Sequence, residues 1–490
     1  MPRPGQPGTP VMPAAAHSLT MVVGFLVAVE FASGVLQGFY TPIFTDIADH
    51  LSISDADVNW FEAAQLIVSA LCVPLLARLA DLVGHKKVLL LATAITALGS
   101  WILAFAPSFT TFLIGWAIQG AYIIWLPLEV AIVYRRTAGT GRQQLLTRRA
   151  AAVLVGALEL SVIIGAVTSG LLVTTWSMTA LLCLPAIVVT AVLVLIWWGI
   201  EDRPGTGTGG IDWWGFALIT AALGLVMTGL IVIRLEGLDS GFAWLFIVAG
   251  LLVLVPFAQH QSRIAEPLVD VRLLATPGQW PVQATAFLFG FSVLGAQIPM
   301  STFARTDPAL AGYGLGADAD FVATLVGLYV LSMATGAFSL PLWSRVVGPR
   351  NALVVAAGLV ALGYGLWLPF HDTLLHAMVN MGVAGVGSGA LVAALPAAAA
   401  AAAPPERTGF ATGMTNATKT VGGAIASAIF AIALTSTGSL GEPDAGHAPL
   451  SGYLTVWAVC AAAALVAAAL VLIAPKEVFE HETEEALPVL

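Results

Sequence analysis

Three ionisable side chains, Glu30, Glu159 and Lys419, lie deep inside long apolar segments of the chain. Each is about 10 or 11 residues from the start of its segment, which corresponds to about 15 Å at the rise of a helix. This depth is near the middle of a hydrocarbon core about 30 Å thick, where a charged side chain costs several kcal/mol. Residues of this kind are typical of proton and ion pathways.

Proton binding is the chemistry that buried carboxyl groups suit. Loss of water favours the neutral acid, whereas water that reaches the group in another conformation favours the carboxylate. We therefore expect Glu30 and Glu159 to carry protons, and Lys419 to pair with one of them. The alternative is a static ion pair of Lys419 with either acid that only fixes helix packing.

Two further acids, Glu62 and Glu129, lie nearer the ends of their apolar segments. Glu129 is within about two helical turns of Arg135 and Arg136, and side chains on neighbouring turns of a helix can pair. We expect Glu129 to form a charge pair at the membrane surface.

Amide and tryptophan side chains inside the apolar segments are candidates for binding a substrate. Amides can orient a ligand, although hydrogen bonds between helices are their more frequent use. Deep tryptophans can line a pocket for aromatic or lipid-like molecules, with core packing as the alternative. The candidates are Gln37, Gln119, Trp116, Trp125, Gln297, Asn380 and Asn416.

The segments that hold these residues must cross a membrane. The 490 residues are 58% hydrophobic and 10% charged, with a mean hydropathy of +0.92, whereas soluble proteins have about 25% charged residues. Only helices and closed barrels satisfy the backbone in lipid, and the alternating pattern of barrel strands is missing. The sequence predicts an all-α polytopic membrane protein with about 14 transmembrane helices. The spans are residues 19–44, 58–80, 87–106, 109–134, 148–174, 178–199, 213–234, 241–259, 283–303, 320–342, 351–370, 374–402, 408–436 and 451–474.

The basic residues sort to one side of this arrangement. If the N-terminus is inside the cell, 16 of the 19 Lys and Arg residues fall on the cytoplasmic side, where positive charge collects. Arg234 and Arg305 fall outside, and Lys419 falls within a span. We expect a multi-pass protein of the cytoplasmic membrane with its N- and C-termini in the cytoplasm.

An internal repeat divides the chain. The segments Pro74 to Lys87 and Pro341 to Arg350 both begin with Pro-Leu and then carry an Arg, a Val-Gly and a basic residue. Two six-span halves related in this way, with two extra spans between them, indicate a transporter architecture. We predict a disordered tail at 1–18, a six-helix bundle at 19–200, a linker with two additional helices at 201–282, a second bundle at 283–474 and an acidic cytoplasmic tail at 475–490.

The segment Ala77 to Lys87, ARLADLVGHKK, resembles the loop motif G-x-L-A-D-R-x-G-R-K of the major facilitator superfamily. Asp212 to Gly215, Glu266 to Asp270 and Glu406 to Gly409 resemble its fourteen-spanner drug:proton antiporter branch. The resemblance implies the major-facilitator fold and proton-driven export of small hydrophobic or amphipathic compounds by alternating access. No cofactor is implied, because the proton gradient supplies the energy.

The motif loop suggests a conformational latch between the two halves. Asp81 is expected to face a basic side chain or a helix N-terminus across the seam, with an ordinary helix cap as the alternative. The residues assigned to the latch are Asp81, Gly84, Lys86, Arg78 and Arg345.

Two motifs depart from the family pattern. Trp116 stands where the span-4 motif R-x-x-Q-G has arginine, and the segment Gly165 to Gly170 lacks the proline of G-P-x-x-G-G. A lipid or glycolipid exporter and an uncoupled facilitator are therefore alternatives within the same fold.

The composition argues against other classes. The eight His and three Cys residues are scattered without metal-ligand spacing, so we predict no metal site and no enzyme, with a membrane-embedded lipid-modifying enzyme as a remote alternative. The expected partners are a small-molecule or lipid-like substrate and membrane lipids, not nucleic acid. The oligomeric state is left open, and a monomer is compatible with the sequence.

Overall fold

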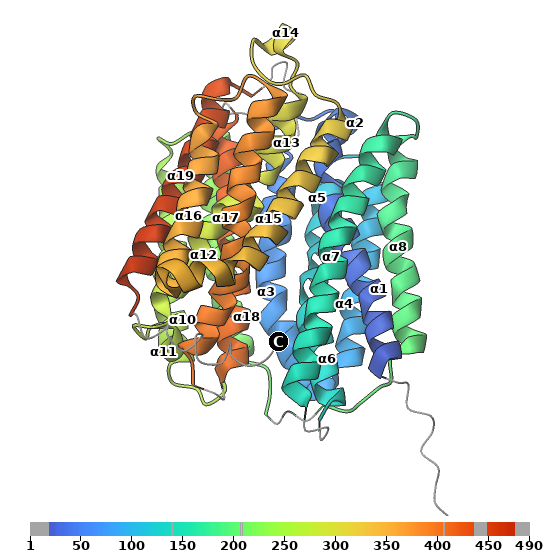
Figure 1. Ribbon diagram of the computed structural model, residues 1–490, viewed down its shortest axis with the longest axis vertical. Coiled ribbons are helices and arrows are strands. Elements are labelled where there is room, and N and C mark those ends of the chain that lie inside the picture. The colour runs from blue at the N-terminus through green and yellow to red at the C-terminus, as the bar shows by residue number, and fades with distance from the viewer. Residues whose placement is uncertain are drawn as a thin grey trace, which may run out of the picture.

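The computed structural model describes residues 19–138, 142–205, 207, 209–404, 407–435 and 448–475. These residues form helices and contain no strand, which confirms the predicted all-α fold. Thirteen of the described helical spans are long and apolar enough to cross a membrane. A further long helix, α18, lies beside them in the bundle (Figure 1) but carries more polar residues. The predicted tails at 1–18 and 475–490, apart from Pro475, lie outside the described residues.

The first half of the chain forms one bundle of helices around a shared apolar core. Its longest element is α7, which packs along α1 and brings residues more than a hundred positions apart into contact. The elements are α1 (Leu19–Gly38), η1 (Thr41–Ile43), α2 (Phe44–Leu51), α3 (Asn59–Val83), α4 (His85–Ala104), α5 (Phe109–Gln119), η2 (Gly120–Ile124), α6 (Trp125–Arg136), α7 (Gln143–Val173) and α8 (Met178–Gly199).

The second half forms another bundle with its own core. The elements after the insert are α11 (Val271–Leu274), α12 (Trp280–Gly290), η3 (Phe291–Gly295), α13 (Gln297–Arg305), α14 (Pro308–Ala311), α15 (Ala319–Val347), α16 (Pro349–Leu366), α17 (Leu374–Ala401), α18 (Thr408–Ala433) and α19 (Leu450–Ile473).

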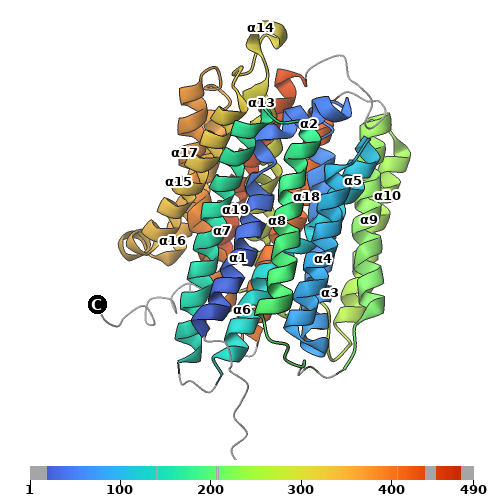
Figure 2. The same cartoon turned by 90° about the vertical axis from the view of Figure 1, so that its right-hand side faces the viewer.

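Two additional helices, α9 (Trp213–Glu236) and α10 (Gly241–Gln261), form a hairpin between the halves in the sequence. Figure 2 shows them side by side at the edge of the bundle. α9 packs against α3 of the first half and α18 of the second. A buried ion pair fixes one end, because Arg234 lies 3.2 Å from Asp57 and the two side chains are 5% and 1% exposed.

Three spans that the sequence predicts as continuous helices are interrupted. A 3-10 turn, η1, separates α1 from α2, a second, η2, separates α5 from α6, and a π-helical turn, η3, separates α12 from α13. α1 and α12 begin the two bundles, and the interruption comes after 20 helical residues in the first and after 11 in the second. Interrupted helices in transporters commonly mark binding sites and moving parts.

The two halves meet toward the end of the bundle that carries α2, α13 and α14, which we call the α2 end; the opposite end is the α6 end (Figure 1). Arg305 of α13 forms an ion pair with Asp46 of α2 at 2.9 Å, and the Ser301 hydroxyl donates to the Thr41 carbonyl. At the α6 end, the last turn of α15 is exposed, with Val346 84% exposed. The described residues therefore form a bundle in which the halves are fastened at the α2 end.

Candidate functional site

Glu30 lies midway along α1 and is 0% exposed. Close packing of α1 against α7 holds this part of the helix in place. A Cβ atom on Gly34 or Gly38 would come within 2.3 Å of the Leu158 carbonyl oxygen or 2.0 Å of the Val162 carbonyl oxygen, so only glycine permits this approach. The close crossing of α1 and α7 therefore fixes the position of Glu30 inside the bundle.

Glu129 of α6 is also 0% exposed, and its carboxyl group lies within hydrogen-bonding distance of the Glu30 carboxyl group. The predicted surface charge pair of Glu129 with Arg135 or Arg136 is wrong, because those residues end the helix and contact other groups. Apolar residues four before and three after Glu129 place it on the buried face of α6. That periodicity was the signal in the sequence for its burial.

The four carboxyl oxygens of Glu30 and Glu129 accept no hydrogen bond from nitrogen or hydroxyl groups of the described residues. Two carboxylates have no proton to donate to each other, so the close approach requires that at least one of them is protonated. The arrangement can bind and release protons.

The two tryptophan candidates belong to buried aromatic clusters of the first bundle. Trp116 is 3% exposed and its ring centroid lies 4.5 Å from that of Tyr40, while Trp125 is 0% exposed and lies against Tyr122. The indole N–H groups of both tryptophans have no acceptor among the described residues. Trp116, where the family motif has arginine, therefore belongs to an aromatic core.

Gln119 joins three polar side chains inside the first bundle. Its side chain donates to the Tyr40 hydroxyl at 3.0 Å and the Ser100 hydroxyl at 2.9 Å, and it accepts from Gln65 at 3.4 Å. Its hydrogen-bonding capacity is thus largely used between helices, the alternative that the sequence left open for such amides.

Glu159 of α7 and Lys419 of α18 face each other from opposite halves. Both are half-buried, and their charges interact, although no ion pair within 4.0 Å joins them. The structure therefore brings Lys419 near Glu159 and not near Glu30, whose carboxyl interacts with Glu129. This pair of opposite charges lies across the seam between the bundles.

The other amide candidates are dispersed. Gln37 is exposed and donates to Ser33 on its own helix, and Gln297 is half-buried and donates to the Val293 carbonyl. Asn380 is 2% exposed and donates to the Phe370 carbonyl at 2.8 Å. Asn416 is half-buried on α18, one turn before Lys419. Among these four, Gln37 shares α1 with Glu30, and Asn416 shares α18 with Lys419.

The residues of the predicted latch do not meet across the halves in this conformation. The Asp81 side chain is 56% exposed, with His85 at 3.9 Å, and Arg345 at the end of α15 is exposed. Arg78 instead forms an ion pair with Glu266 of the segment after α10. Gly84 adopts a φ of 109°, a conformation that suits glycine, and ends α3.

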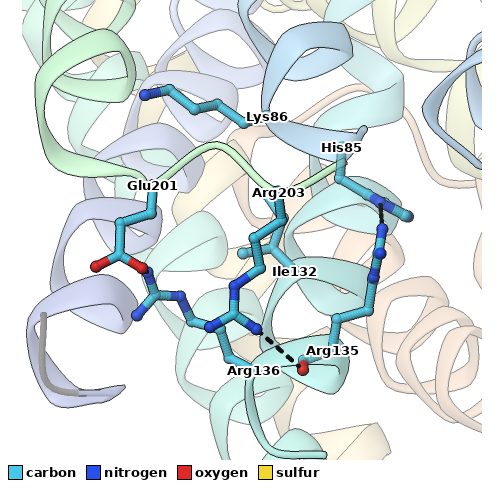
Figure 3. A pocket seen from close by; sticks show the side chains of 7 residues that line it. All are labelled: His85, Lys86, Ile132, Arg135, Arg136, Glu201 and Arg203. Carbon is cyan, nitrogen blue, oxygen red and sulfur yellow. Dashed lines mark hydrogen bonds and ion pairs between the residues drawn. The ribbon is translucent and has the colours of Figure 1, made fainter. Parts of the chain in front are cut away.

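Basic side chains gather beside the motif loop at the α6 end (Figure 3). Arg135 contacts His85 at 3.1 Å and the Pro204 carbonyl at 2.9 Å, and Lys86 donates to the Trp197 carbonyl at 2.9 Å. Glu201 lies 2.6 Å from Arg136. The cluster fastens the ends of α4 and α6 to the segment that follows α8.

Comparisons with known proteins agree with this architecture. The sequence profile of the Major Facilitator Superfamily matches residues 26–306 and 282–488. The chain is 28% identical over 408 residues to the cephamycin export protein CmcT of Amycolatopsis lactamdurans, covering 80% of each chain. It is 25% identical over 315 residues to a uridine/deoxyuridine transporter of Lactococcus lactis subsp. cremoris, covering 63% of this chain and 64% of that protein. A crystal structure of an auto-inhibited peptide transporter of the POT family superposes with a TM-score of 0.66 at 16% identity, covering 94% of this chain and 97% of that one. The chain belongs to the major facilitator superfamily and is a multi-pass membrane transporter, not an enzyme.

Proposed function

We propose that this transporter exports small hydrophobic or amphipathic compounds in exchange for protons, by alternating access. The observation that carries the proposal is the carboxyl group of Glu30, which is fully buried midway along α1. A buried acid without a cationic partner is stable only when protonated, and it loses the proton when water reaches it. A conformational change that admits water to Glu30 therefore couples proton release to transport.

Glu159 and Lys419 form a second pair of ionisable groups that takes part in the exchange. Because they belong to different halves, any rocking of the bundles changes the distance between their charges. We assign proton binding to Glu159 as well, with Lys419 as its charge partner. The ion pair of Arg305 with Asp46 would open when the halves part at the α2 end, and the residues of the latch would meet when the α6 end closes.

Export of amphipathic compounds is supported by the buried aromatic clusters around Trp116 and Trp125 in the first bundle and by the relative named as a cephamycin export protein. Orientation follows from the charges: the cationic cluster at the α6 end fits the cytoplasmic side of the cell membrane, with both termini inside. The substrate is a small molecule that enters from the bilayer or the cytoplasm, and the transporter works with membrane lipids around it.

The test uses purified protein in proteoliposomes. A thermal-shift screen of amphipathic compounds selects ligands, and counterflow identifies those that are carried. Imposing a pH gradient should then drive accumulation of the carried compound, and Glu30→Gln should abolish that accumulation while counterflow persists. Accumulation that ignores the gradient in the native protein would indicate an uncoupled facilitator, and movement of a lipid alone would indicate a lipid exporter.

A further inference from the structure

Glu129 has no role in the function proposed so far, and it is the acid closest to Glu30. The two carboxyl groups come from α1 and α6, almost one hundred residues apart in the chain, and both are 0% exposed. Each is within hydrogen-bonding distance of the other, and no donor among the described residues reaches any of their four oxygens. An isolated buried acid would need only its own proton, but two acids in contact must divide protons between them.

We propose that Glu30 and Glu129 form a single proton-binding unit, in which a shared proton joins the two carboxyl groups and neither group carries a proton alone. The inference rests on the proposed function and adds Glu129 as a second residue, which binds the proton together with Glu30. The step is balanced: two carboxylates and one proton give a carboxylic acid that donates its O–H to the remaining carboxylate. Release of the proton restores two carboxylates and requires water around them.

No hydrogen-bond donor among the described residues reaches the two carboxyl groups, so a shared proton is what can join them. Tyr122 interacts with Glu30, and Tyr40 and Glu62 interact in turn with Tyr122; none of these three groups is a cation. Tyr122 is within electrostatic reach of both Glu30 and Glu62. The cations on the elements packed against α1 and α6 lie toward the α6 end of their helices; they are Arg78, His85, Lys86, Lys87, Arg135, Arg136, Arg148 and Arg149.

The burial of the two carboxyl groups also determines when the proton can leave. Two like charges in contact in a dry interior cannot both persist, so the unit holds its proton while it is buried. α6 begins directly after the 3-10 turn η2, and Glu129 is on its second turn. A shift of α6 against α1 at this interruption would separate the carboxyl groups and admit water to both at once.

The experiment compares Glu30→Gln, Glu129→Gln and the double variant with the native protein. Infrared spectra of the reconstituted protein in D₂O measure the C=O band of protonated carboxyl groups. In a single variant the remaining acid is still buried without a cationic partner, so it keeps the proton, but the acceptor of its O–H is no longer a carboxylate. We expect each single variant to keep one protonated carboxyl band at a shifted position and the double variant to lose that band, so that the loss in the double variant exceeds the sum of the two single losses. Additive losses, or a band that keeps its native position in both single variants, would overturn the proposal.

Transport supplies the second readout. Either single variant should lose accumulation driven by a pH gradient while counterflow persists, and the double variant should lose no more. Full gradient-driven accumulation in Glu129→Gln would also overturn the proposal, whatever the infrared result. Glu62→Gln is the matched control for the spectra, because it removes another interior carboxyl group near Tyr122 and its band loss should add to that of Glu129→Gln.

The experiments distinguish failure of the proton exchange from failure of the shared proton. If the native protein moves no substrate against a pH gradient, the proposed exchange fails, while non-additive infrared losses still establish the shared proton. If exchange is present and the losses are additive, the exchange stands and the two acids act independently. Counterflow and thermal unfolding midpoints close to native values show that each variant is folded.

Discussion

Lys419 is the one basic side chain that the described structure places midway along α18, and Glu159 is the acid that faces it. Both side chains are half-buried, so water weakens their attraction, and a pair of this kind contributes about 1 kcal/mol or less to stability. The value of the pair to the transporter lies in its position across the seam. Its loss should affect transport more than folding.

Exchange of the two charges tests this role. Lys419→Gln and Glu159→Gln should each slow gradient-driven accumulation, because one charge then faces the interior without a partner. The double variant Glu159→Lys with Lys419→Glu should restore part of the rate that either single reversal loses, measured in proteoliposomes. Equal losses in the swap and in the single reversals would show that the pair is not coupled.

Asp212 is a residue outside the membrane spans whose surroundings set its charge. It caps α9, and its carboxylate accepts hydrogen bonds from the Gly215 amide at 2.9 Å, His260 at 2.9 Å and Gln261 at 2.6 Å. Burial raises the pKa of the Asp212 carboxyl, but the hydrogen bonds from Gly215, His260 and Gln261 outweigh it, so the pKa lies below its ordinary value. The folded state therefore favours the carboxylate.

A stability difference that depends on pH follows from the lowered pKa of Asp212. The stabilisation is complete above the unfolded pKa of about 3.9 and is lost as the pH falls through the lower folded pKa. At neutral pH, Asp212→Ala should cost about 1 kcal/mol, the usual value of a lost cap. Thermal unfolding in detergent from neutral to acid pH measures it: the native and variant midpoints should approach each other below about pH 4. A gap that stays constant into acid pH would contradict the assignment.

At the scale of elements, the contact of α1 with α7 positions Glu30. Gly38 lies where a Cβ would come within 2.0 Å of the Val162 carbonyl oxygen, whereas Gly24 on the same helix has no atom within 4 Å of the equivalent point. The two glycines therefore differ in packing and not in helix type.

Gly38→Ala should destabilise the protein by about 1 to 3 kcal/mol, because α1 and α7 must move apart. Gly24→Ala, the control, should be neutral or stabilising by up to about 1 kcal/mol through helix propensity. Denaturation in detergent followed by tryptophan fluorescence compares them. Similar stabilities for the two variants would show that the close approach does not constrain the crossing.

Apolar length suffices to predict the transmembrane helices and the all-α fold, because a span must be long and apolar whatever it packs against. The interruptions η1, η2 and η3 are missed because a change of hydrogen-bond register within one turn leaves hydropathy unaltered. The contact of Glu30 with Glu129 is missed for another reason: spacing along α6 shows only Arg135 and Arg136 as partners, while contact between helices depends on how each is rotated. Of the candidate site, the sequence supplies the acids and the structure supplies their pairing.

For the whole molecule, the insert α9–α10 has unequal attachments to the halves. It is tied to the first half at both ends, through the buried pair Arg234 and Asp57 and through Glu266 and Arg78. Its contact with the second half includes Asp270 and Arg407 at 3.4 Å, and the Arg407 side chain is 47% exposed. Breaking a buried ion pair costs about 3 to 5 kcal/mol, much more than breaking an exposed one.

The insert should therefore move with the first half when the bundles rock. Spin labels on exposed, lipid-facing positions test this: Leu245 of α10 is paired with Leu98 of α4 in the first half and with Leu362 of α16 in the second. Changing the pH or adding a transported compound should leave the 245–98 distance distribution unchanged and shift the 245–362 distribution. In Arg234→Met, which leaves Asp57 buried without this ion pair, the 245–98 distribution should broaden, whereas Arg263→Met at an exposed site should not alter it. A constant 245–362 distance with a changing 245–98 distance would assign the insert to the second half instead.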